Sequence, residues 1–239
     1  MEAIEEKKVT SWGWPPGKVA MLVRHAVRLV LFLGLLFGAA GSLYWVPGWV
    51  FVAVTVGGGL LLYAYVERTQ PGLMKRRTRI GSNTKRWDKV FLGVYFAFYF
   101  AILAVGALDA GRFGWDPLPA WSTWVGVAVL VTSYVLFAWA MGHNRHFEAT
   151  VRIQHDLEHR VIDTGPYGIV RHPGYVGGLL AVVGSALVLQ SWIALLPGAV
   201  AGIAMVVRTW AEDRTLRREL EGYAAYAERV RYRLLPGLW

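Results

Sequence analysis

Residues 163–178 read DTGPYGIVRHPGYVGG and lead directly into a long apolar run. The Gly-Pro pair at 165–166 and the His-Pro pair at 172–173 are turn signals. Proline is also favoured in the first turn of a helix, where its missing N–H group costs nothing. The stretch therefore predicts a loop that folds back on itself and then starts a membrane helix, with Arg171 and His172 at the N-terminal end of that helix.

This stretch has a structural and a functional interpretation. It can be no more than a tight connection between two spans. Alternatively, the unpaired N–H groups and the positive partial charge of the helix N-terminus can hold an anionic or electron-rich ligand group. Polar residues are costly at bilayer depth, so this concentration of special residues favours the ligand site.

The apolar content of the chain indicates a membrane protein. Of its 239 residues, 55% are hydrophobic, and a spanning helix needs only about 20 apolar residues. The apolar block at 175–207 is too long for one span at about 1.5 Å per residue, and Gln190 and Ser191 near its middle predict a helical hairpin. We therefore expect an all-α fold, a polytopic membrane helical bundle of about six spans. Their predicted ranges are 27–46, 49–66, 89–108, 121–141, 175–190 and 192–207.

The chain is predicted to form a single membrane domain over residues 1–239, because no polar stretch is long enough to bury a core of its own. Residues 1–66 would form an N-terminal helical pair. We expect the first apolar run to be a retained span, since the polar segment before it lacks the features of a cleaved signal. The chain contains no cysteine, which excludes disulfides, thiolate nucleophiles and cysteine metal sites.

Basic residues are distributed very unevenly among the predicted loops. Of the 25 Lys and Arg residues, only Arg112 falls on the opposite side of the membrane from the others. Because cytoplasmic loops carry the excess of Lys and Arg, both termini and the loops at 67–89 and 143–173 are predicted to be cytoplasmic. The net charge of +9 thus sets topology and favours contacts with anionic membrane lipids. No soluble recognition module is present, so we expect no nucleic-acid partner.

The segment after the last span, 208–239, is predicted to be an amphipathic helix that lies on the membrane or caps the bundle. Its apolar residues recur at helical spacing, with arginines between them; they are Leu216, Leu220, Tyr223, Ala227 and Val230. The acidic pair Glu212 and Asp213 directly follows the span. Carboxylates are costly there unless they are solvated or paired. The pair is therefore either solvated or ion-paired with Arg208 or Arg214, or it belongs to a site.

Residues 165–177, GPYGIVRHPGYVG, resemble the cofactor motif of the isoprenylcysteine carboxyl methyltransferase family, integral-membrane enzymes related to phospholipid N-methyltransferases. The family pattern is Gly-Pro-Tyr, a short gap, Arg-His-Pro, any residue, Tyr, any residue and Gly. An acidic pair follows about one helical hairpin later, and a tail with Tyr and basic residues ends near a proline. The segments at 87–89 and 152–154 also look like the family. The resemblance covers about residues 67–239, which would form a methyltransferase-like core with its cofactor region at 150–239.

The resemblance implies an S-adenosylmethionine-dependent methyltransferase with its cofactor site on the cytoplasmic face. The acceptor would be lipophilic and enter from the bilayer. A carboxylate of a prenylated or lipidic molecule is the main expectation, and an amine headgroup is the alternative. Arg171 and Glu212 are the predicted catalytic residues, and Arg171 would either position an acceptor carboxylate or support the pocket. The predicted cofactor-binding residues are Gly165, Pro166, Tyr167, His172, Pro173, Tyr175, Gly177, Glu212 and Asp213.

Three residues depart from the family pattern. Gly168 stands where the family often has Arg, and Gly174 stands where it often has a bulkier residue such as Met. Asp213 replaces the second Glu of the acidic pair. The two glycines mean that the motif does not define the acceptor.

Three other classes fit part of the sequence. Membrane reductases of the sterol C14 type have a similar Tyr- and Arg-rich tail but use NADPH, and the Arg-His-Pro-Gly-Tyr run at 171–175 fits the methyltransferases better. A di-iron hydroxylase would use the pairs His143/His146 and His155/His159, but such sites need more histidines than the 6 in this chain. We therefore expect no metal. A non-catalytic transporter or structural membrane protein is the remaining alternative, although the first four spans offer little charge for an ion pathway.

Overall fold

The computed structural model describes residues 16–77, 84–154 and 157–239, with side chains from residue 23 onward, and most of this part of the chain is helical. Its one β-feature is an isolated bridge between Pro117 and Ser191. The elements are α1 (Pro16–Ala40), α2 (Val46–Thr69), α3 (Leu73–Arg77), α4 (Arg86–Gly106), the π-helix η1 (Ala107–Phe113), α5 (Ser122–His143), the 3₁₀-helix η3 (Gly165–Gly168), α6 (Pro173–Val188), α7 (Leu195–Glu219) and α8 (Tyr223–Arg229).

Five segments of this part of the chain are long and apolar enough to cross a membrane. They are Val23–Ala40, Val46–Thr69, Arg86–Phe113, Ser122–His143 and Leu195–Glu219. The fifth predicted span, 175–190, corresponds to α6, which is apolar but has only 16 residues, a length of about 24 Å. The all-α polytopic bundle predicted from the sequence is therefore confirmed, with α6 shorter than a full span.

The predicted hairpin at the end of the apolar block is present. α6 ends at Val188 and α7 begins at Leu195. Between them Gln190 adopts a left-handed backbone conformation, with φ +60°. Its side-chain amide donates a hydrogen bond to the Thr123 hydroxyl on α5 (2.8 Å), so the turn is fixed to the neighbouring helix.

The third predicted span ends at residue 108, which leaves a turn at 109–120, and this prediction is wrong for the first part of the turn. Residues 107–113 continue α4 as a π-helix, and Asp109 is fully buried. Its carboxylate accepts hydrogen bonds from the Ser191 hydroxyl (2.6 Å) and from the Asp116 N–H (2.9 Å). Because these donors satisfy the carboxylate, the helix can carry an acidic residue into the bundle where a solvent-exposed turn was expected.

α5 and α6 pack closely because glycines remove side chains from their interface. A Cβ on Gly126 would lie 2.4 Å from the backbone nitrogen of Val188, and one on Gly184 would lie 2.9 Å from the side chain of Leu130. The Ser133 hydroxyl also donates to the Gly177 carbonyl (2.8 Å). These contacts hold the start of α6, and thus the motif at 165–177, against α5.

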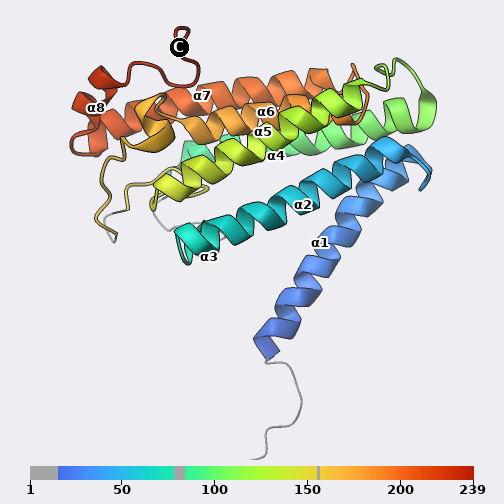
Figure 1. Ribbon diagram of the computed structural model, residues 1–239, viewed down its shortest axis with the longest axis horizontal. Helices are drawn as coiled ribbons and strands as arrows, with labels where there is room; N and C mark the ends of the chain where they lie inside the picture. Colours follow the sequence, from blue (N-terminus) through green and yellow to red (C-terminus); the bar gives the residue numbers. More distant parts are fainter. Residues whose placement is uncertain (1–15, 78–83, 155–156) are drawn as a thin grey trace, which may run out of the picture.

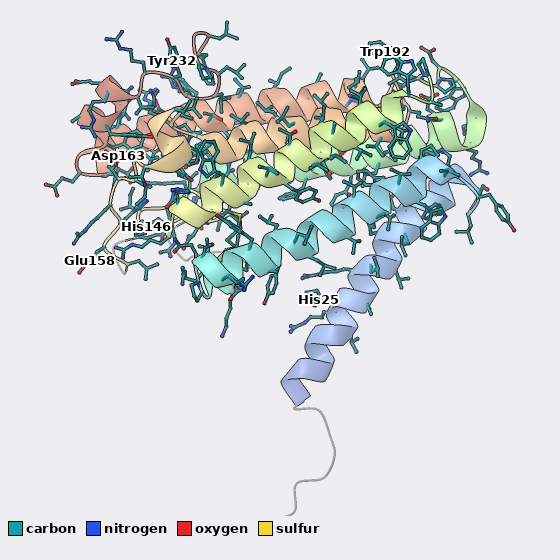
Figure 2. The ribbon with its side chains drawn as sticks, viewed as in Figure 1. His25, His146, Glu158, Asp163, Trp192 and Tyr232 are labelled. Carbon is teal, nitrogen blue, oxygen red and sulfur yellow. The ribbon has the colours of Figure 1, made fainter. Side chains whose placement is uncertain are left out.

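The loops lie at the two ends of an elongated helical bundle (Figure 1). α2 and α4–α7 run alongside one another. In contrast, α1 begins away from the bundle and contacts it near the C-terminal end of α1. α3, the start of α6, the end of α7, α8 and the C-terminus gather at one end, and the α6–α7 turn lies at the other. Figure 2 shows His146, Asp163 and Tyr232 at the first end and Trp192 at the second.

The C-terminal tail folds back onto the bundle, as predicted for an amphipathic segment. Gly222, with φ +79°, allows the sharp change of direction between α7 and α8. The buried tail residues form one apolar cluster with Ile153 and Val161 packed against it; its members are Leu216, Leu220, Tyr223, Tyr226, Ala227 and Val230. The tail thus covers the loop that precedes the motif.

The predicted division into an N-terminal pair (1–66) and a core (67–239) stays a prediction. α2 packs along α5, and the Tyr134 hydroxyl of α5 donates to the Thr55 carbonyl of α2 (3.2 Å). The N-terminal helices are therefore joined to the core by direct packing.

Candidate functional site

The motif begins with a glycine that no other residue can replace without strain. Gly165 has φ +58°, and a Cβ on it would lie 2.4 Å from the ring of His143. Farther along, the N–H groups of Arg171 and His172 donate to the carbonyls of Tyr232 (2.9 Å) and Arg233 (3.0 Å). The loop predicted from the Gly-Pro and His-Pro pairs is therefore held between α5 and the C-terminal tail.

Arg171 joins the motif to α7 and the tail. Its guanidinium donates to both oxygens of Asp213, at 2.7 and 3.1 Å, and to the carbonyls of Val230 (2.7 Å) and Arg231 (2.8 Å). The side chains of Arg171 and Asp213 are each 1% exposed. Arg171 borders the cavity described below, but its donors are used within the fold. Of its two predicted roles, this geometry favours support of the pocket.

Asp213 is the centre of this network. Besides Arg171, its carboxylate accepts hydrogen bonds from Arg233 (3.0 Å), Arg217 (3.3 Å) and the Tyr223 hydroxyl (3.0 Å). Four side chains therefore use its two oxygens. Asp213 does not line the cavity, so a direct contact with a cofactor, as predicted from the acidic pair, finds no support in its position.

Glu212, the other member of the pair, faces the cavity. It is half-buried and accepts a hydrogen bond from the Tyr175 hydroxyl. The Tyr175 ring is stacked on the His172 ring, with centroids 5.6 Å apart and an angle of 6° between the planes. Adjacent acidic residues on α7 thus have different surroundings, because one points to the tail and the other to the cavity.

Arg208 lies one helical turn before Glu212 and was not among the predicted site residues. Its guanidinium lies 4.9 Å from the centroid of the Tyr175 ring and donates to Asp88 on α4 (2.7 Å) and to the Ala149 carbonyl (2.8 Å). Asp88 is fully buried and also accepts the Val151 N–H (2.7 Å). Arg208 and Glu212 are spaced i, i+4, which puts both side chains on one face of a helix. This spacing is the sequence feature that could have identified Arg208 as a site residue.

Residues from the segments 144–154 and 159–162 form the opposite side of the cavity. Gln154 donates to the His146 carbonyl (2.7 Å), and the rings of His146 and His159 lie 4.6 Å apart. Burial lowers the pKa of His146 from its usual value of 6.5, which favours the neutral imidazole. Glu148 is held by two hydrogen bonds from Arg152, both 2.7 Å.

The histidine pairs considered for a metal do not form a metal centre within the described residues. No group of three or more His, Asp or Glu side chains there is arranged to hold an ion. His155 lies outside the described residues. His146 and His159 instead lie in the cavity wall.

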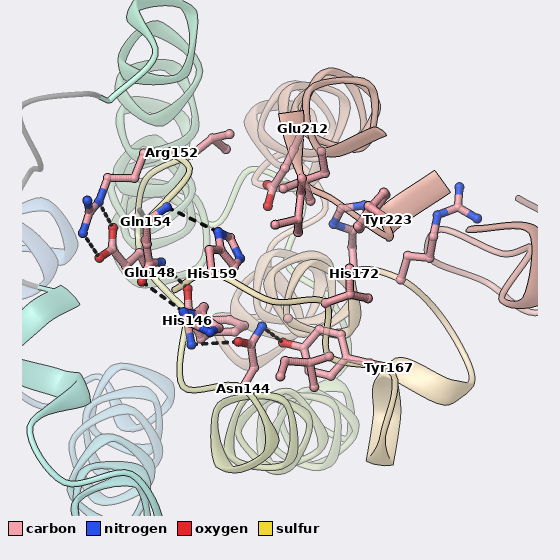
Figure 3. Close-up of a pocket in the computed structure, with 18 of the residues that line it drawn as sticks. Asn144, His146, Glu148, Arg152, Gln154, His159, Tyr167, His172, Glu212 and Tyr223 are labelled. Atoms are coloured by element: carbon pink, nitrogen blue, oxygen red, sulfur yellow. Dashed lines mark hydrogen bonds and ion pairs between the residues drawn. The ribbon is translucent and has the colours of Figure 1, made fainter. Parts of the chain in front are cut away.

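The cavity between these two sides has an empty volume of about 810 Å³, which includes space open to solvent. Figure 3 shows Glu212, His172 and Tyr223 on one side of it and His146, Gln154 and His159 on the other. Burial raises the pKa of Tyr167 and of Tyr223 above the usual value. Their phenols therefore stay protonated and can donate hydrogen bonds.

The cavity brings together most of the predicted site residues. Those that line it are Tyr167, Arg171, His172, Pro173, Tyr175 and Glu212. Those that do not are Gly165, Pro166, Gly177 and Asp213. The second group shapes the backbone, packs α6 on α5 or binds Arg171, so its members support the walls from behind.

Residues 121–221 match the family model described as phospholipid methyltransferase. The match confirms the resemblance predicted from the sequence. It extends from the start of α5 to the end of α7 and so includes both sides of the cavity. Together with the apolar helices, it supports an integral-membrane methyltransferase. No curated protein matches the chain.

Proposed function

We propose that the protein transfers a methyl group from S-adenosylmethionine to a lipophilic acceptor. The observation that carries this proposal is the cavity in the matched region, where Tyr175 and His172 from the motif meet Glu212 and Arg208 from α7. Segments far apart in the sequence thus place a carboxylate, aromatic faces and a cation around one space.

The residues around the cavity suit this cofactor. Glu212 has no arginine or lysine within ion-pair distance among the described residues, so it can accept hydrogen bonds from the ribose diol. The faces of Tyr167 and Tyr175 suit a sulfonium cation. Leu216 and Leu220 give an apolar surface for adenine. The bound cofactor supplies an electrophilic methyl group, and the sulfur retains the electrons of the broken C–S bond.

The chain contributes alignment and exclusion of water, which are the main requirements of a direct transfer. Arg208 is fixed by Asp88, so its charge is held at the cavity wall. Tyr175 fixes the direction of Glu212 through its hydroxyl. No side chain has to act as a nucleophile.

The acceptor is proposed to be a lipid that reaches the cavity from the bilayer. A carboxylate on a prenylated or otherwise lipidic molecule follows from the isoprenylcysteine carboxyl methyltransferase resemblance. An amine headgroup is the alternative, and the description of the matching family model, phospholipid methyltransferase, supports a phospholipid acceptor. The concentration of basic loops at the site end supports a cytoplasmic cofactor site and cytoplasmic termini.

Methyl transfer into defined lipids tests the proposal. Purified protein in vesicles would be incubated with S-adenosylmethionine carrying a radiolabelled methyl group and either an N-acylated S-prenylcysteine or phosphatidylethanolamine. We expect label in one of the two lipids, and at least a tenfold slower transfer after Glu212→Ala. Reduction of a sterol double bond with NADPH, without methyl transfer, would instead support a membrane reductase. Absence of both reactions would leave the non-catalytic alternative.

A further inference from the structure

Arg77, the last residue of α3, has a buried nitrogen that no group in the structure satisfies. Its Nη1 atom has no hydrogen-bond partner among the described residues. A buried donor without a partner is costly, and more so when it carries charge. Burial also lowers the pKa of Arg77, to about 10. The fold therefore maintains an unsatisfied cation at the end of the bundle that contains the cavity.

Arg77 lies next to the cavity, with the Phe147 ring between them. The guanidinium lies 4.7 Å from the centroid of the Phe147 ring, and Phe147 is part of the cavity wall. The edge of the same ring fills the space beside Gly174, where a Cβ would lie 2.5 Å from the Phe147 Cζ atom. The bulkier residue common in the resembling family would collide here, so Gly174 is the residue that allows Phe147 to lie between Arg77 and the start of α6.

The other buried arginines near the cavity have anionic partners. Arg171 is paired with Asp213, and Arg208 is paired with Asp88. In each pair the arginine Nε atom lies 2.7 Å from a carboxylate oxygen, so the charge is neutralised within the fold. Arg77 differs from them, since its ion-pair partner would have to come from outside the described residues.

The surroundings of Phe147 are apolar on the side of α2. Phe147 belongs to a hydrophobic cluster of residues from α2, α3 and α5, whose members include Val66, Leu73, Met74 and Met141. α2 is one of the candidate membrane spans. A cation next to an apolar cluster, at the end of a span, suits a molecule with an anionic headgroup and a hydrocarbon chain.

We propose that Arg77 and Phe147 form the headgroup subsite of the lipid acceptor, in which the Arg77 Nη1–H binds an anionic oxygen group, either a carboxylate or a phosphate diester. This inference rests on the proposed function for the identity of the lipid as the methyl acceptor. In this arrangement Arg77 holds the anionic group of the acceptor, which is the methyl-accepting group itself in a carboxylate acceptor and a neighbouring group in a phospholipid.

Lipid binding in detergent, without cofactor, tests the subsite directly. Two matched pairs of lipids would be titrated: an N-acylated S-prenylcysteine against its methyl ester, and phosphatidylethanolamine against diacylglycerol. In one pair we expect the wild-type protein to bind the member that carries the carboxylate or phosphate at least about tenfold more tightly, since a charge-assisted hydrogen bond is lost in the member without it. The pair that shows this preference identifies a carboxylate or a phosphate as the bound group.

The variant Arg77→Gln is expected to abolish the preference while leaving the affinity for S-adenosylmethionine within about twofold. Arg77→Lys keeps the charge but loses the planar fork, so it should retain part of the preference. Arg68→Gln, at an exposed arginine at the end of α2, is the matched control and should bind like the wild type.

Two results would overturn the subsite: a wild-type protein that does not distinguish the lipid with the carboxylate or phosphate from its partner without it, or an Arg77→Gln variant that still does. The first needs no variant, so it remains decisive even if Arg77→Gln fails to fold. Failure of the proposed function is a separate result. A protein that transfers no methyl group but shows an Arg77-dependent preference retains the lipid subsite and loses the assigned reaction.

Discussion

The two ends of the bundle bury carboxylates in different ways. At the α6–α7 turn, Asp109 is satisfied by neutral donors, a hydroxyl and a backbone N–H. At the opposite end, Asp213 is surrounded by three arginines and a tyrosine, while its neighbour Glu212 faces the cavity. The first arrangement closes a turn. The second builds a wall from charged groups and leaves one carboxylate directed at the cavity.

The largest effect is expected from Asp213→Ala. Removing this carboxylate leaves Arg171 buried without a counter-ion, and breaking a buried pair costs about 3–5 kcal/mol. At about 2–4 °C per kcal/mol for a chain of this size, thermal unfolding in detergent should occur roughly 6–20 °C lower. Glu219→Ala on the same helix, which removes a more exposed pair with Lys85, should shift unfolding by no more than about 4 °C. Equal shifts for the two variants would contradict the central role of Asp213.

The second-largest loss of stability is expected from a change at the contact between α5 and α6. Gly126→Ala places a Cβ 2.4 Å from a backbone nitrogen of α6, and overpacking of this kind costs about 1–3 kcal/mol. Thermal unfolding should therefore shift downward by roughly 2–12 °C. Gly59→Ala on α2 is the control, because nothing lies within 4 Å of its Cβ position. An unfolding temperature for Gly126→Ala at or above that of Gly59→Ala would show that α6 does not depend on this close approach.

Glu212→Gln separates binding from stability. The amide keeps the shape of the side chain and can still accept the Tyr175 hydroxyl, so the unfolding temperature should change by less than about 2 °C. The affinity for S-adenosylmethionine should fall by about tenfold, or about 1.4 kcal/mol, because the acceptor loses its charge. Calorimetric titration of the variant provides the measurement. Unchanged affinity in a folded variant would remove Glu212 from the cofactor site.

The smallest effect concerns pH. Burial lowers the pKa of His146 below 6.5 in the folded protein, so the unfolded chain binds this proton more readily. The stability that His146 contributes is present above about pH 6.5 and is lost as pH falls through the folded-state pKa. Unfolding temperatures measured between pH 7.5 and pH 5 should decline, and the decline should be shallower in His146→Gln. If the unfolding temperature declines with pH equally in the two proteins, the pKa of His146 does not change on folding.

Local sequence patterns predicted the parts of the structure that depend on local residues. The length of the apolar block and the Gln190-Ser191 pair predicted the hairpin, and the Gly-Pro and His-Pro pairs predicted the loop before α6. Helical spacing predicted the tail that packs on the bundle. Each of these features is decided by residues within a few turns of one another.

The features that the sequence did not reveal depend on partners far apart in the chain. Asp109 continues a helix because Ser191 lies beside it, 82 residues away. Arg208 was considered a partner for the acidic pair, yet it binds Asp88, 120 residues away. The different roles of Glu212 and Asp213 follow from which side of α7 each one faces. That direction depends on how the tail packs, and no pattern within the pair contains this information.

The central claim is that the cavity binds S-adenosylmethionine, and calorimetric titration of the detergent-purified protein tests it most directly. S-adenosylmethionine, S-adenosylhomocysteine and NADPH would be titrated side by side. We predict micromolar binding of the sulfonium cofactor or of its product and no binding of NADPH. Binding of NADPH alone, or of none of the three, would contradict the proposed methyltransferase.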